Sequence, residues 1–89
     1  MKALELNDLE KDIIAKCNEL TKPHGLEVGK YKIKRSTKYC ITQDGYNILS
    51  NDDLIQVHKF CQDKSDLETL ALTAPAMVKN YKEKEAAGG

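Results

Sequence analysis

A histidine and a cysteine lie one helical turn apart in the second half of the chain. His58 and Cys61 could touch on a helix, and a thiol beside an imidazole is a possible nucleophilic pair. With Cys17 and Cys40 the same residues could also offer four zinc ligands. The spacing argues against zinc, because the three cysteines lie more than twenty residues from one another and zinc sites usually include a close Cys pair. No glycine-rich turn or third orienting group accompanies the thiol. We therefore predict a protein that is not an enzyme and has no metal, no other cofactor and no small-molecule substrate.

Basic residues gather in one short stretch, although the chain as a whole carries no net charge. The stretch, residues 30–38, contains five cations: Lys30, Lys32, Lys34, Arg35 and Lys38. On one face of a hairpin they could follow the phosphates of a nucleic acid. The alternative is a solvated sheet face whose lysines discourage edge-to-edge association. The absence of an exposed aromatic among them for base stacking favours that alternative.

The first element that could position these residues is a helix of about residues 8–21. Asn7 is the expected N-cap, and Glu10, three residues later, completes a capping box. Apolar residues then recur at steps of three and four, which predicts one buried stripe. The stripe consists of Leu6, Leu9, Ile13, Cys17 and Leu20, with Ile14 beside it. Pro23 and Gly25 end the helix.

Three Tyr-x-Ile units follow the helix, and each predicts a strand with two apolar side chains on one face. The expected strands cover about residues 28–34, 38–42 and 46–49, with turns at 35–37 and 43–45. The predicted core face is Tyr31, Ile33, Tyr39, Ile41, Tyr46 and Ile48. The lysines would then occupy the opposite face.

Two more helices complete the predicted fold. Ser50 is the expected N-cap of a helix that ends near Gln62, and Ser65 with Glu68 starts another. Pro75 should kink or restart that last helix. The order predicts a two-layer α+β fold with an N-terminal helix, a three-stranded antiparallel meander and two C-terminal helices. We expect one domain, residues 1–85, and a flexible tail, residues 86–89.

The helix after the meander has more apolar surface than one packing face requires. Its apolar arc spans about 220°, whereas a surface helix needs a stripe of roughly 100°. Either the last helix packs across this excess or part of it meets another chain. The second alternative predicts a protein-binding module, acting as a regulator, inhibitor or accessory subunit, with homodimerisation as one form of that binding. The predicted protein-binding residues are Ile55, Lys59 and Phe60. The alternative is a nucleic-acid-binding module that uses residues 30–38.

The expected location is the cytoplasm. The sequence shows no basic segment followed by an apolar signal core, and no apolar run approaches the roughly 18 residues of a membrane span. An odd number of cysteines without framework spacing is typical of reduced thiols.

Overall fold

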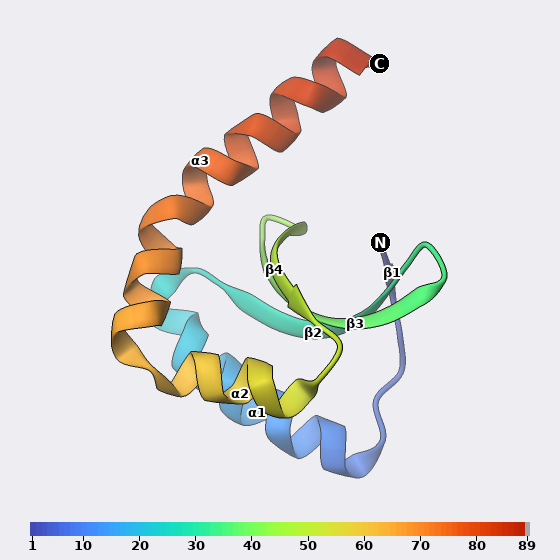
Figure 1. The fold of residues 1–89 in the computed structure, drawn as a ribbon, viewed down its shortest axis with the longest axis vertical. Helices are drawn as coiled ribbons and strands as arrows, with labels where there is room; N and C mark the ends of the chain where they lie inside the picture. The colour runs from blue at the N-terminus through green and yellow to red at the C-terminus, as the bar shows by residue number, and fades with distance from the viewer. Residues whose placement is uncertain (89) are drawn as a thin grey trace.

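A four-stranded antiparallel sheet and three α-helices make up residues 1–88, the part of the chain that the computed structural model describes (Figure 1). The elements are β1 (Lys2–Ala3), α1 (Asp8–Thr21), a 3-10 turn η1 (Lys22–His24), β2 (Glu27–Ile33), β3 (Ser36–Gln43), β4 (Tyr46–Asn51), α2 (Leu54–Gln62) and α3 (Lys64–Gly88). Helices α1 and α2 lie together on one side of the sheet, so the predicted α+β class is confirmed. The sheet has one strand more than the predicted meander, because β1 pairs with β2. Two residues are too few to show an alternating pattern in the sequence.

Helix α1 begins as predicted but buries a different face. The Asn7 side chain accepts a hydrogen bond from the Glu10 N–H at 2.8 Å, and Glu10 Oε1 accepts one from the Asn7 N–H at 3.0 Å. The residues that α1 buries are Glu10, Ile14, Cys17 and Thr21. Leu9, expected in the stripe, is 70% exposed. The buried face differs from the predicted stripe because the Glu10 carboxylate also faces the sheet, where Lys30 and Tyr39 donate hydrogen bonds to it.

The loop between β2 and β3 is shorter than predicted and changes the pairing of the strands. Ile33 lies opposite Ser36, which leaves only Lys34 and Arg35 in the loop, with Lys34 at a φ of 58°. The predicted turn at residues 35–37 is therefore wrong. A change of one residue in register moves every side chain of a strand to the other face.

The faces of the sheet are correspondingly different from the predicted ones. Lys30 lies opposite Tyr39 on the face toward the helices, while Tyr31 lies opposite Lys38 on the other face. Val28, opposite Ile41, replaces Tyr31 and Ile33 as the β2 contribution to the core. The predicted common face of Tyr31, Ile33, Tyr39 and Ile41 is thus wrong, and so is the predicted lysine face.

Strand β4 is longer than predicted and contains a bulge. Ile41 pairs with Leu49 and Thr42 with Asn47, so Ile48 is an extra residue on β4. The strand continues to Asn51, two residues beyond the predicted end. Ser50 consequently lies in the strand and does not cap α2. The cap is Asp53, whose side chain accepts a hydrogen bond from the Ile55 N–H at 2.9 Å.

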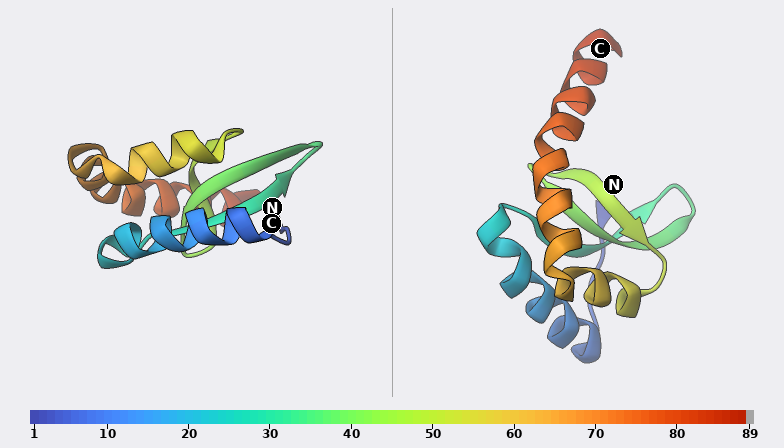
Figure 2. Two further views of the ribbon diagram at one scale, coloured as in Figure 1. Left: turned by 90° about the horizontal axis from the view of Figure 1, so that it is seen from below. Right: turned by 60° about the vertical axis from the view of Figure 1, so that its left-hand side comes forward.

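One hydrophobic core joins all three α-helices to the sheet. Its buried members are Ile14, Cys17, Leu26, Val28, Ile41, Ile48, Leu54, Val57, Cys61, Leu67, Ala74 and Val78. Helix α3 contributes to this core with residues from Leu67 to Val78, and its last turns lie beside the β3–β4 turn, where Lys82 pairs with Asp44 (Figure 2). The rings of Tyr46 and Tyr81 stack with centroids 5.5 Å apart, and the Tyr46 hydroxyl donates to Glu85 at 2.7 Å.

Helix α3 is continuous through its internal proline. It starts at Lys64, where the Asp63 side chain accepts a hydrogen bond from the Asp66 N–H at 3.0 Å, and not after a Ser65 cap. Pro75 lies inside this helix, so the predicted restart does not occur. The helix includes residues 86–88 of the predicted tail, while residue 89 lies outside the described residues. Flexibility of this tail remains a prediction.

Candidate functional site

An open groove of about 440 Å³ lies between the end of β4, helix α2 and the start of α3. It is lined by Leu49, Ser50, Asn51, Gln56, Val57, Lys59, Phe60, Asp63 and Asp66. Two of the three predicted protein-binding residues, Lys59 and Phe60, belong to this lining. Ile55 is 48% exposed but lies outside it. Phe60 is five positions after Ile55, and a step of five positions places the two side chains about 140° apart around the helix axis.

The apolar part of the groove is continuous with the hydrophobic core. Val57 is 2% exposed and belongs to the core, while Phe60 and Leu49 are half-buried and pack against it. Because both side chains pack against the core, the apolar surface that they expose is held in position. Leu49 is not among the predicted binding residues, because the predicted strand ends at this residue and the predicted helix cap, Ser50, follows it.

The rim of the groove is polar and carries charge of both signs. Asp63 and Asp66 lie where α2 meets α3, and Lys59 projects from α2 as an exposed side chain. The two carboxylates outnumber the single cation, so this end of the groove favours a positively charged ligand group. Asp63 caps the start of α3 and Asp66 lies in its first turn. In the sequence, a favourable charge at a helix start would by itself account for both aspartates.

One wall of the groove is the edge strand of the sheet. The strand order is β1-β2-β3-β4, so β4 pairs with β3 on one side only. Within residues 1–88, no backbone hydrogen bond joins the outer side of β4 to another segment. This edge therefore offers free backbone donors and acceptors beside an apolar surface.

The five predicted nucleic-acid-binding residues do not share one face. The Lys30 ammonium lies 3.1 Å from Glu10 Oε2 beneath α1, and Lys38 forms an ion pair with Asp52. Lys32, Lys34 and Arg35 remain exposed at the end of the hairpin. Lys2, opposite Lys32 in the register, joins them there.

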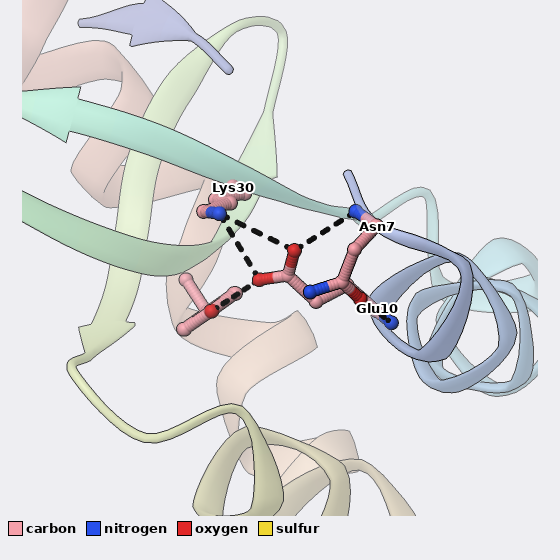
Figure 3. A network of polar contacts seen from close by, with 4 residues as sticks. Asn7, Glu10 and Lys30 are labelled. Atoms are coloured by element: carbon pink, nitrogen blue, oxygen red, sulfur yellow. Dashed lines mark hydrogen bonds and ion pairs between the residues drawn. The ribbon is translucent and has the colours of Figure 1, made fainter. Parts of the chain in front are cut away.

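Glu10 forms a network of polar contacts that ties α1 to the sheet (Figure 3). Its carboxylate accepts hydrogen bonds from the Asn7 N–H, the Tyr39 hydroxyl and the Lys30 ammonium. These bonds, the one from Asn7 foremost, lower the pKa of Glu10 to about 2 despite its burial. The hydrogen bond to Glu10 and partial burial raise the pKa of Tyr39 to about 12. The contacts of Glu10 within the α1 cap and with the sheet thus account for both pKa shifts.

The cysteines are buried in two separate places. Cys17 of α1 and Cys61 of α2 are in contact in the core, and this contact, followed by burial, raises the pKa of Cys61. Cys40 lies on the sheet face opposite to that of Ile41, and burial raises the pKa of its thiol. The raised pKa makes the thiols of Cys40 and Cys61 poor nucleophiles, because the thiolate is the reactive form. The hydrogen bond with Cys61 lowers the pKa of Cys17, whose side chain is nevertheless fully buried. Across residues 1–88, no cluster of three or more His, Cys, Asp or Glu side chains could hold a metal ion.

Comparison with known proteins does not assign this chain to a family. No family model matches it, and no curated protein or solved structure matches it either. None of the helices in the described part of the chain is long and apolar enough to cross a membrane. Function must therefore be argued from the chain's own surface.

Proposed function

We propose that this protein is a non-enzymatic protein-binding module, acting as a regulator, inhibitor or accessory subunit, whose partner contacts the groove beside α2. The observation that carries the proposal is the half-buried Phe60, exposed at a groove whose wall is an unpaired strand edge. Aromatic side chains held firmly within an apolar patch are typical anchors of protein interfaces. Lys59 beside it supplies a polar rim.

A cytoplasmic location is part of the same proposal. All three cysteines are free thiols, which suits a reducing compartment. Cys17 and Cys61 touch without being joined, so they would be open to oxidation in a compartment that forms disulfides.

The experiment that tests the proposal compares Phe60→Ala with a control in affinity isolation from the native host. The control is Leu72→Ala, because Leu72 is 83% exposed on α3 and outside the groove. Nuclease treatment should leave the partner bound to the unmodified protein and to the control. Phe60→Ala should weaken binding by at least about 1 kcal/mol in calorimetry with that partner, while the far-UV spectrum stays native-like. A partner that is lost with nuclease, or that binds Phe60→Ala at full strength, would contradict the proposal.

A second candidate function is nucleic-acid binding by the tip of the β2–β3 hairpin. Lys2, Lys32, Lys34 and Arg35 gather there, and none of the four has an ion-pair partner within residues 1–88. It has less support than the groove, because Lys30 and Lys38 are already engaged by carboxylates. A fluorescence anisotropy titration against salt would test it. Sub-micromolar binding whose log–log salt slope falls by roughly two after Lys32 and Lys34 are both replaced by Ala would make it the better candidate.

A further inference from the structure

We propose that the groove binds an extended segment of a partner protein, which adds to the outer edge of β4 as a further strand. One apolar side chain of the segment would rest on Phe60 and Leu49. A lysine or arginine near that side chain would face Asp63 and Asp66. This inference rests on the proposed function and specifies the class of partner.

The two edges of the sheet differ in how well they resist an added strand. Folded proteins protect sheet edges with very short strands and with lysines. The β1 edge has both protections, since it is two residues long and places Lys2 opposite Lys32. Strand β4 has six residues, none of them charged and none proline. Its bulge at Ile48 limits regular pairing to the half that lines the groove, Leu49–Asn51.

This half of β4 is fixed in place before any partner binds. Asp52, which follows the strand, forms an ion pair with Lys38 of β3. The Asn51 side chain accepts a hydrogen bond from the Asp53 N–H at 2.8 Å, and Asp53 in turn caps α2. A preformed strand end lowers the entropic cost of docking, because only the incoming segment has to become ordered.

The groove complements a strand that carries one apolar side chain and a nearby cation. Strand addition gains affinity from main-chain hydrogen bonds and specificity from pockets for alternate side chains. Here the half-buried side chains of Phe60 and Leu49 supply the apolar surface for such a side chain. The carboxylates of Asp63 and Asp66 lie at the same groove and are both exposed. They would attract a cation on the segment.

A second copy of this chain fits the groove less well. A two-fold dimer places the same surface patch of each subunit against the other. Such a dimer would bring the carboxylates Asp63 and Asp66 of the two subunits toward each other, whereas a segment that carries a cation complements them. The extended segment is therefore the occupant that the charge favours.

The test uses the full chain and a phage-displayed library of random twelve-residue peptides. Selected peptides should share an apolar residue with Lys or Arg within two positions, and they should bind without dimerising the protein. In NMR spectra, backbone contacts should join an extended peptide to Ser50 and Asn51. Phe60→Ala should weaken the peptide at least tenfold. Asp63→Asn with Asp66→Asn should weaken it several-fold, and Leu72→Ala should leave it unchanged.

Three results would overturn the inference. A peptide that binds this groove as a helix would exclude strand addition while still supporting a protein-binding function. Dimerisation in sedimentation velocity, abolished by Phe60→Ala, would identify a second copy as the occupant. Failure to select any peptide that contacts Leu49–Asn51 would also exclude strand addition, and the partner isolated from the host would then test the proposed function separately.

Discussion

The carboxylate of Glu10, in the first turn of α1, accepts a hydrogen bond from the hydroxyl of Tyr39 in β3, 29 residues later. The same carboxylate closes the capping box of α1 with the Asn7 N–H and pairs with the Lys30 ammonium. One side chain therefore completes a local helix cap and joins the helix to two strands. Because Glu10 is buried, the charge depends on all of these partners.

Replacing Glu10 by Gln should destabilise the protein and remove part of its dependence on pH. The pKa of Glu10 is about 2 in the folded protein, against 4.5 as its ordinary value. The unfolded chain therefore binds this proton more readily, and the stability that Glu10 contributes is complete above pH 4.5 and lost as the pH falls toward 2. Urea unfolding at neutral pH should show a loss of about 1–3 kcal/mol for Glu10→Gln.

The matched control is Glu19→Gln, on an exposed position of the same helix. It should change the free energy of unfolding by less than about 0.5 kcal/mol and keep the acid dependence of the unmodified protein. If Glu10→Gln and Glu19→Gln lose the same stability between pH 5 and pH 3, the Glu10 network is not the source of the acid dependence.

Glycine at position 29 makes room for the ring of Tyr31. A Cβ at this position would lie 2.9 Å from Tyr31 Cε2, closer than unstrained carbon atoms approach. Gly29→Ala should therefore cost about 1 kcal/mol, at the low end of overpacking costs, because the atoms in the way are the end of a half-buried side chain that can rotate. In a Tyr31→Ala background the same change should stabilise the strand by about 0.5–1 kcal/mol, since alanine has less conformational freedom than glycine in the unfolded chain. A double-mutant cycle measured by urea unfolding checks this reversal, and an equal cost in both backgrounds would contradict it.

The register of β2 and β3 predicts unequal roles for two isoleucines. Ile41 is 0% exposed in the core, whereas Ile33 is half-buried at the end of the hairpin and outside the core cluster. Ile41→Ala should cost about 2–5 kcal/mol through lost burial and the cavity left behind, and Ile33→Ala considerably less. Lys32→Ala, an exposed control, should stay within about 0.5 kcal/mol. Equal losses for the two isoleucines in urea unfolding would mean that the strands pair in another register.

The two prolines of the chain should respond differently to replacement by alanine. Pro75 lies inside α3 and is exposed, so it removes a helix hydrogen bond without providing much packing. Pro75→Ala should therefore raise the free energy of unfolding by about 1–3 kcal/mol. Pro23 lies at the start of the 3-10 turn η1, where proline is well accommodated, and Pro23→Ala should give no gain. Thermal melting followed by circular dichroism compares them, and a loss of stability in Pro75→Ala would show that α3 depends on its proline.

Features that arise between near neighbours in the chain could be predicted from the sequence. The capping box of Asn7 and Glu10, the bounds of α1 and the order of the helices and of strands β2 to β4 follow from contacts within about one turn of the chain. The surplus apolar surface of α2 also indicated Phe60 and Lys59, because a helical period shows which residues cannot share one face. These features require no knowledge of what packs against them.

The faces of the sheet and the groove could not be predicted from the sequence, because they depend on how distant segments pack. The loop at Lys34 and Arg35 is one residue shorter than the predicted turn, and that difference moved Tyr31 out of the core and brought Lys30 to Glu10. The groove depends on a strand edge that reaches Asn51 and on the turn between α2 and α3, which brings Asp66 to the same groove as Phe60. Strand register and helix rotation are set by the sum of contacts between residues far apart in the sequence. A local sequence pattern contains information only about the residues that form it.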